Sequence, residues 1–110
     1  MSKIAILGAA ESGVGAAVLA LKKGYDVFVS DMGLIKEHYK DILNAHGIEW
    51  EEGRHTASRI LDAEEIIKSP GIPDNAPMVA EAIAKGIHII NEIEFAARYT
   101  NAKMICITGS

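Results

Sequence analysis

The sequence predicts an α/β fold: a Rossmann-like three-layer domain with helices on both faces of a mainly parallel sheet of about five to six strands. Two observations lead to this prediction. Short apolar runs alternate with amphipathic segments along the 110 residues. Three of the amphipathic segments end at a glycine, and an apolar run follows within a few residues. This alternation is typical of parallel strands joined by right-handed helical crossovers.

The first strand is expected at residues 4–7, and the turn at residues 8–13 joins it to an Ala-rich helix. Val14 and Val18 recur at helical spacing, and Gly24 ends this helix. A turn between a buried strand and a helix aims free backbone N–H groups at an anion. The turn therefore predicts a site for a phosphate-bearing nucleotide.

The middle of the chain repeats the pattern. A strand is expected at residues 26–30, and a second helix ends at Gly47 and leads into a strand at residues 48–51. Another strand is expected at residues 65–68. One face of the second helix carries the apolar side chains Ile35, Tyr39, Ile42 and Leu43.

The last third begins with a helix that Pro77 helps to start and that ends at Gly86. A strand is expected at residues 87–90, and Asn91 is expected to cap a short helix over about residues 93–99. A final strand runs to Ile107.

Composition excludes several classes of protein. The net charge of −4 gives no general attraction for nucleic acid or for an anionic membrane. No run approaches the roughly 20 apolar residues of a membrane span. With no export signal in the sequence, we expect a cytoplasmic protein.

Several polar or reactive residues are expected to be structural. The single cysteine, Cys106, lies in an apolar run and reads as a small buried hydrophobe. The four histidines show no paired spacing with cysteine or acid that suits a metal, so no metal site is expected. Glu49, Glu51 and Glu52 are expected on the solvent face and at the end of a strand.

The turn at residues 8–13 matches the dinucleotide fingerprint G-x-G-x-x-G imperfectly, because Ala10 stands at the middle glycine. Ser12 offers a hydroxyl, and the amides of Ser12 and Gly13 start the helix. Glu11 must point away, since a carboxylate repels bound phosphate. The alternative is a purely structural strand-to-helix turn, in which glycine serves close packing.

Asp31 follows Gly8 by 23 residues, at the end of the second strand. An acid at roughly this offset binds the adenosine ribose in nicotinamide-binding folds, and a carboxylate there accepts hydrogen bonds from a ribose or a base. A helix cap or a solvated turn residue is an equal alternative.

Ser69, Pro70 and Gly71 follow the fourth strand. Pro70 fixes its own φ and keeps Ser69 out of the helical region, while Gly71 can take a positive φ. On physical grounds alone an ordinary Pro-Gly turn is favoured. Its place at the same sheet edge as Asp31 makes it a candidate for ligand contact.

Four motifs together resemble a known family: GAAESGVGAA, VFVSD, KSPGIP and EIEFAARYTNAKMICITGS. They are similar to the N-terminal region of the Mur ligases of peptidoglycan synthesis, and among these to the ligases that add D-glutamate to UDP-N-acetylmuramoyl-L-alanine. The resemblance covers essentially the whole chain. It implies a Rossmann-like domain that holds the UDP part of the substrate, while a central domain binds ATP and a third domain adds substrate contacts.

The resemblance also implies roles for single residues. Those that line the diphosphate are Ala10, Glu11, Ser12 and Gly13. Asp31 and Met32 contact the uracil, Gly71 lies near the nucleoside, and the loop shapes are set by Gly8, Ser69 and Pro70. The chain departs from the family at Ala10, which replaces a glycine, and at Met32-Gly33, where relatives can carry Thr-Arg. Main-chain contacts are expected to compensate.

The resemblance further divides the chain into a UDP-binding domain at residues 1–107 and, at residues 108–110, the start of the family's phosphate loop. The lysine and hydroxyl with which that loop holds ATP and magnesium are not among the 110 residues. We expect an N-terminal fragment that binds no cofactor and ligates nothing alone. Its expected partners are UDP-N-acetylmuramoyl-L-alanine and the central and C-terminal domains of the same chain.

In the complete family enzyme, ATP phosphorylates the L-alanine carboxylate and the D-glutamate amine displaces the phosphate. Two other classes of function remain open. The turn and Asp31 also suit an NAD-binding domain of a dehydrogenase or of an NAD-sensing regulator. The chain is alternatively a non-enzymatic interaction module whose apolar face docks on a partner.

Overall fold

The computed structural model describes residues 2–99, in which five strands alternate with five helices. Their order is β1 (Lys3–Leu7), α1 (Glu11–Lys22), β2 (Asp26–Asp31), α2 (Glu37–Ala45), β3 (Glu49–Glu52), α3 (Ala57–Ile60), β4 (Glu65–Lys68), α4 (Pro77–Ala84), β5 (His88–Asn91) and α5 (Glu92–Tyr99). Three predictions lie outside the described residues: the last strand, which ends at Ile107, the burial of Cys106, and the domain division at residues 108–110.

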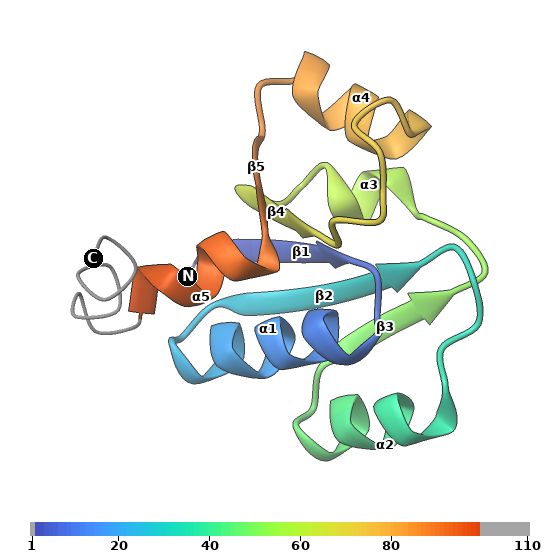
Figure 1. Ribbon diagram of the computed structural model, residues 1–110, viewed down its shortest axis with the longest axis vertical. Coiled ribbons are helices and arrows are strands. Elements are labelled where there is room, and N and C mark those ends of the chain that lie inside the picture. The colour runs from blue at the N-terminus through green and yellow to red at the C-terminus, as the bar shows by residue number, and fades with distance from the viewer. Residues whose placement is uncertain (1, 100–110) are drawn as a thin grey trace, which may run out of the picture.

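The five strands form one parallel sheet in the order β3-β2-β1-β4-β5 (Figure 1). Leu7 at the end of β1 pairs with Ser30 of β2 on one side and Lys68 of β4 on the other. The carboxyl ends of these three strands therefore reach the same edge. The chain moves outward from β1 to β3 and then returns to the opposite side of β1, so the strand order reverses between β1 and β4.

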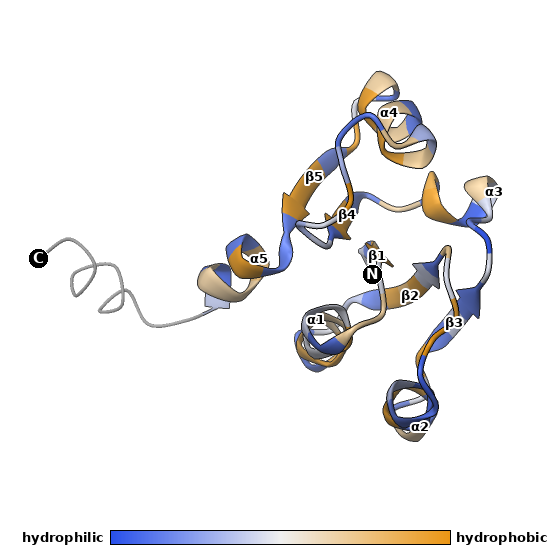
Figure 2. Cartoon of the chain, turned by 45° about the vertical axis from the view of Figure 1, so that its right-hand side comes forward, coloured by the Kyte–Doolittle hydropathy of each residue, from blue (hydrophilic) through white to orange (hydrophobic). Residues whose placement is uncertain are grey.

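Helices cover both faces of the sheet (Figure 1). On β1, Ile4 and Ile6 join a core with α1, α2 and α5, while Ala5 and Leu7 join a second core with α3 and α4. This alternation follows from the period of two in a strand. Figure 2 shows the apolar residues along β2 and the polar residues along much of α2. The predicted three-layer α/β fold is confirmed.

Three helices end in the same way. The glycines after α1, α2 and α4 have positive φ, as predicted: 91° at Gly24, 69° at Gly47 and 80° at Gly86. In each case the next amide donates to the carbonyl five residues earlier, at 2.9–3.1 Å: Tyr25 to Ala20, Ile48 to Leu43 and Ile87 to Ala82. Because Ile48 and Ile87 terminate helices, β3 and β5 begin one residue later than predicted.

The capping prediction at Asn91 is confirmed. Its Oδ1 accepts a hydrogen bond from the Glu94 amide at 2.7 Å, and Glu94 Oε1 accepts one from the Asn91 amide at 3.0 Å. This reciprocal pair is a capping box. The sequence did not predict α3, because its four residues are too few to show a helical period.

Candidate functional site

A pocket of about 520 Å³ lies beyond the carboxyl ends of β1, β2 and β3 and reaches the start of α4. In open parallel sheets, ligands bind outside this edge, near the reversal of strand order. Its lining is Leu7, Gly8, Asp31, Met32, Gly53, Arg54, His55, Ile72, Ala76, Pro77, Met78 and Val79. The part from residue 72 onward is therefore apolar, and polar groups come from the ends of β2 and β3 and from the loop after β3.

The glycines of the first turn are required by close packing. Gly8 has φ of 103°, and a Cβ there would lie 3.1 Å from the Cβ of Ser69. A Cβ on Gly13 would lie 1.9 Å from the carbonyl oxygen of Gly8. The structural interpretation of this turn therefore holds, since α1 approaches the end of β1 too closely for a side chain at residue 13.

The same turn also leaves donors free. Ala10 precedes α1 without a side-chain cap, and the first bond at this helix end runs from the Val14 amide to the Ala10 carbonyl at 2.9 Å. Within residues 2–99, the amides of Glu11, Ser12 and Gly13 have no backbone partner. Free amides at a helix N-terminus favour an anion.

The Glu11 side chain is not part of the pocket lining. It lines a separate depression between α1 and α2, together with Val14 and Tyr39. Ser12 is exposed and lies in another depression against α5. The four residues predicted to line the diphosphate thus form the start of α1 and are not in the pocket lining, to which the 8–13 turn contributes only Gly8.

Asp31 lies in the pocket wall and also holds two turns together. Its Oδ2 accepts a hydrogen bond from the Ala9 amide and its Oδ1 one from the Gly33 amide, both at 2.8 Å. Each carboxylate oxygen has a second lone pair, so these bonds leave room for a ligand donor. Met32, which is 61% exposed, lines the pocket beside it.

The loop after β4 forms a turn closed by a 3.0 Å hydrogen bond from the Ile72 amide to the Ser69 carbonyl. Gly71 does not take the positive φ that a glycine at this position allows. With proline second in the turn, a type I geometry needs no positive φ at the third residue. Ile72 lines the pocket and Ser69 packs on Gly8, whereas Pro70 and Gly71 are exposed and outside the lining.

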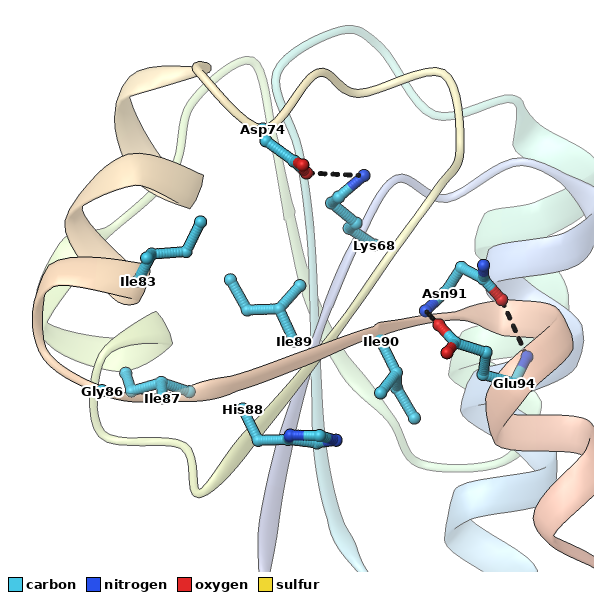
Figure 3. A pocket seen from close by; sticks show the side chains of 10 residues that line it. All are labelled: Lys68, Asp74, Ile83, Gly86, Ile87, His88, Ile89, Ile90, Asn91 and Glu94. Atoms are coloured by element: carbon cyan, nitrogen blue, oxygen red, sulfur yellow. Dashed lines mark hydrogen bonds and ion pairs between the residues drawn. The ribbon is translucent and has the colours of Figure 1, made fainter.

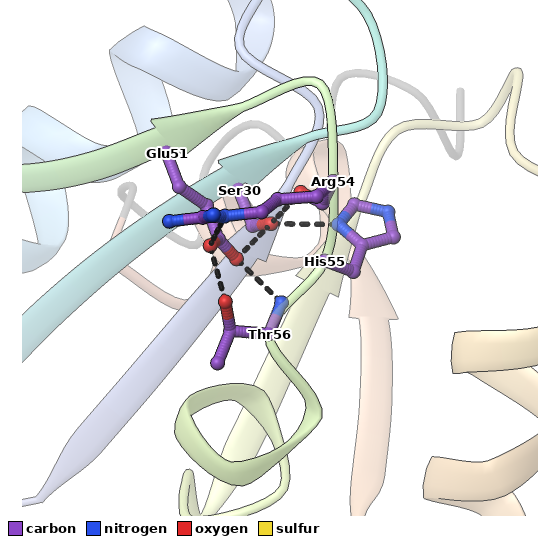
Figure 4. A network of polar contacts seen from close by, with 5 residues as sticks. All are labelled: Ser30, Glu51, Arg54, His55 and Thr56. Carbon is purple, nitrogen blue, oxygen red and sulfur yellow. Dashed lines mark hydrogen bonds and ion pairs between the residues drawn. The ribbon is translucent and has the colours of Figure 1, made fainter.

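A buried polar network supports the wall that β2 and β3 form (Figure 4). Glu51 is only 9% exposed, which corrects the expectation that it lies on the solvent face. Its carboxylate accepts hydrogen bonds from Ser30 Oγ at 2.7 Å, the Thr56 amide at 2.7 Å and Thr56 Oγ1 at 2.5 Å. Arg54 Nε lies 3.3 Å from Glu51 Oε1. These donors offset the cost of burying a carboxylate.

The pKa of Glu51 reflects both effects. Burial raises the pKa, but the hydrogen bonds from Thr56, Ser30 and Arg54 outweigh it and hold the pKa below its ordinary value. Glu51 is therefore ionised at neutral pH.

Sequence reasoning missed the loop after β3, which supplies Gly53, Arg54 and His55 to the pocket. Arg54 is the one cationic side chain in this lining among the described residues. The position of the loop was a usable signal, because a segment that follows a parallel strand reaches the same edge as Gly8 and Asp31.

A second pocket, of about 570 Å³, lies between α4 and β5 (Figure 3). Lys68 forms an ion pair with Asp74 at 3.4 Å and donates to the Ile72 carbonyl at 2.9 Å. Asn91 and Glu94 are engaged in the capping box. These polar groups are committed to local contacts, so the pocket beyond β1–β3 is the better candidate site.

Within residues 2–99, no group of three or more His, Cys, Asp or Glu side chains could hold a metal ion. None of the helices described there has the length and apolar character needed to cross a bilayer.

Comparisons with known proteins identify relatives of the chain. Residues 3–78 match the family model described as the MurD N-terminal domain. The UDP-N-acetylmuramoylalanine–D-glutamate ligase of Bacteroides fragilis is 63% identical over 110 residues, which cover the whole chain and 25% of the relative. The ligase of the same name from Porphyromonas gingivalis is 64% identical over 107 residues, 97% of this chain and 24% of the relative.

The fold is also found among solved structures. The UDP-N-acetylmuramate-alanine ligase MurC of Thermotoga maritima superimposes with a TM-score of 0.73 at 23% identity, over 86% of this chain and 22% of that one. The chain therefore spans about a quarter of the length of these ligases.

Proposed function

Because the chain belongs to the MurD N-terminal domain family, we propose that its pocket beyond β1–β3 binds the UDP part of UDP-N-acetylmuramoyl-L-alanine. The observation that carries the proposal is the composition of this pocket at the strand-order reversal. Ile72, Ala76 and Met78 offer an apolar surface for the faces of a flat base, and Asp31 and His55 offer polar atoms for its edge. The free amides at the start of α1 lie beside it to receive the diphosphate.

In this proposal the roles of individual residues follow the expected ones. The diphosphate is held at Ala10, Glu11, Ser12 and Gly13 through their main chain, which makes the exposed Ala10 methyl tolerable. Asp31 and Met32 contact the uracil. Gly71 approaches the nucleoside only if the 69–72 turn shifts, because the turn as described holds Gly71 outside the pocket lining.

The chemistry of ligation is assigned to the longer enzyme. There, ATP with magnesium phosphorylates the L-alanine carboxylate and the D-glutamate amine displaces the phosphate to form the amide. Residues 1–110 contribute by holding a remote part of the substrate, so that its binding energy orients the reacting end. We propose that this chain alone forms no product, and that it acts in the cytoplasm with the ligase's other two domains.

The proposal is tested by isothermal titration of the purified chain with UDP-N-acetylmuramoyl-L-alanine, UDP and NADH. Two substitutions on one stretch of chain serve as a matched pair. Ala76→Phe places a ring in the pocket, and Ala80→Phe places the same ring on the exposed face of α4. We expect both uridine ligands to bind and Ala76→Phe to weaken binding at least tenfold, with Ala80→Phe near the unsubstituted value.

Binding of NADH with no binding of UDP would overturn the proposal in favour of the dehydrogenase or NAD-sensor alternative. Equal effects of the two phenylalanines would place UDP elsewhere on the molecule.

A further inference from the structure

His55 lies where the pocket wall meets the buried polar network (Figure 4). It follows β3, is half-buried and lines the pocket. Its Nδ1 is 2.6 Å from Ser30 Oγ, and the figure shows the other ring nitrogen on the side away from Ser30. The imidazole therefore joins a buried hydroxyl to the space that a ligand would occupy.

The partners of Ser30 determine which nitrogen of His55 carries the proton. Ser30 Oγ lies 2.7 Å from Glu51 Oε2, 3.0 Å from the Arg54 carbonyl oxygen and 2.6 Å from His55 Nδ1. A hydroxyl has one proton to donate, and the ionised carboxylate and the carbonyl can only accept. If the proton of Ser30 pointed at His55, both oxygen–oxygen contacts would lack a proton, so it goes to one of these two oxygens and His55 Nδ1 is the donor in its contact with Ser30.

The charge state of His55 follows from its surroundings. Burial lowers the pKa of His55, while the carboxylates of Glu51 on β3 and Asp31 on β2 raise it only in part. At neutral pH the ring is therefore neutral, with its single proton on Nδ1. Nε2 then carries a lone pair, and within residues 2–99 it has no hydrogen-bond partner.

We propose that His55 is a specificity-determining residue of this pocket, where Nε2, fixed as an acceptor by the contact of Nδ1–H with Ser30, receives a hydrogen bond from a ring N–H of the bound base. This inference rests on the proposed function. Besides His55, the described lining residues include one further side chain with a strong acceptor, Asp31. Each of its two oxygens already accepts a hydrogen bond from a backbone amide. Nε2 is thus the side-chain acceptor with no prior commitment.

The ligand chemistry that fits is a pyrimidine dione. Uracil carries an imide N–H at N3, which can donate to Nε2, whereas a methyl group at N3 removes that donor and leaves Nε2 unpaired. Sites that hydrogen-bond a donor reject analogues that lack it. The geometry therefore gives the pocket a means of selecting uracil by its N3–H.

Two measurements on the chain test this inference. The first is the ¹⁵N NMR spectrum of the His55 ring without ligand, in which we expect the proton on Nδ1 at neutral pH. A proton on Nε2 overturns the inference whatever the ligand does.

The second measurement compares the affinities of UDP and N3-methyl-UDP for the unsubstituted chain, His55→Asn and His55→Gln. An asparagine amide can replace Nδ1–H toward Ser30 but has nothing at the position of Nε2, while a glutamine oxygen can reach that position. We expect UDP to bind the unsubstituted chain about tenfold more tightly than N3-methyl-UDP. His55→Asn should lose most of this preference and His55→Gln should keep part of it.

The outcomes separate the two proposals. If UDP binds and His55→Asn keeps the full preference, either Asp31 accepts the N3–H or the methyl group acts by its bulk, and the role of His55 is wrong while the UDP pocket stands. If UDP does not bind the unsubstituted chain, both the pocket assignment and the role of His55 fail.

Discussion

The buried hydroxyl of Ser30 organises the candidate site at the level of single residues. Ser30 is fully buried at the end of β2, opposite Glu51 in the register of β3. The pair links two strands and the loop that carries Arg54 and His55. A buried polar network of this kind is stabilising only while every member has a partner.

Glu51→Gln tests the network. The substitution puts an amide N–H₂ among groups that need an acceptor, and we expect the free energy of unfolding to fall by about 1–3 kcal/mol. Glu49→Gln is the matched control on the same strand, since the Glu49 side chain is 70% exposed and its carboxylate forms an ion pair with Arg59 at the surface. Urea denaturation measures both. A loss as large for Glu49→Gln as for Glu51→Gln contradicts the role given to the network.

His55 gives the stability a pH dependence of predictable sign. Its pKa is lowered in the folded state, so between the ordinary histidine pKa of about 6.5 and the folded value the unfolded chain binds a proton that the folded chain does not. The contribution of neutral His55 to the free energy of unfolding is complete above about pH 6.5 and is lost as the pH falls below that value. Urea denaturation at about pH 7.5 and about pH 5.5 measures this effect. Between these pH values the free energy of unfolding should fall more for the unsubstituted chain than for His55→Asn. Equal losses would show that His55 has an ordinary pKa.

Part of the pocket could be predicted from single residues and part could not. Asp31 follows an obvious strand at a suggestive distance from Gly8, and the structure brings both into the pocket lining. Glu51 reads as a surface residue because an alternating Glu-Trp-Glu-Glu strand carries no sign of its burial. That burial depends on Ser30 and Thr56, which only the sheet register and the loop after β3 bring to it.

Among the elements, the strand-turn-helix unit of β1 and α1 sets the geometry of the site. The 1.9 Å between a hypothetical Gly13 Cβ and the Gly8 carbonyl oxygen shows how tightly α1 sits on the turn. Gly15, two residues further along α1, has no atom within 4 Å of its hypothetical Cβ. The two glycines of one helix therefore have different physical roles.

Gly13→Ala and Gly15→Ala make that difference measurable. We expect Gly13→Ala to lower the free energy of unfolding by about 1–3 kcal/mol or more, because the turn must open to admit the methyl group. Gly15→Ala should raise it by about 0.5–1 kcal/mol, since alanine restricts the unfolded chain and favours the helix. Thermal or urea denaturation distinguishes them, and a neutral Gly13→Ala would show that the turn tolerates a side chain.

The boundaries of the elements were predicted best where a glycine ends a helix. Gly24, Gly47 and Gly86 fix three helix ends, and the one-residue delay of β3 and β5 arises because Ile48 and Ile87 still serve the helix termini. The turn at Ser69–Ile72 was harder to predict. Its composition is compatible with two turn types that differ in the φ of Gly71.

For the whole molecule, the order β3-β2-β1-β4-β5 explains why one edge of the sheet carries the candidate site. Segments from the ends of β1, β2 and β3 converge with the start of α4 around one pocket. The alternation of strands and helices in the sequence was sufficient to predict this class of fold and this edge. Nothing in the sequence indicates the second pocket at β5, which arises from the packing of α4.

The measurement that tests the account most directly is an NMR titration of the ¹⁵N-labelled chain with UDP, followed through the assigned backbone amides of residues 2–99. The account predicts that the amides of residues 8–13, 31–33 and 53–55 shift together and saturate at one affinity, while those around the second pocket at residues 86–91 stay in place. Shifts confined to residues 86–91, or shifts caused by NADH and not by UDP, would contradict it.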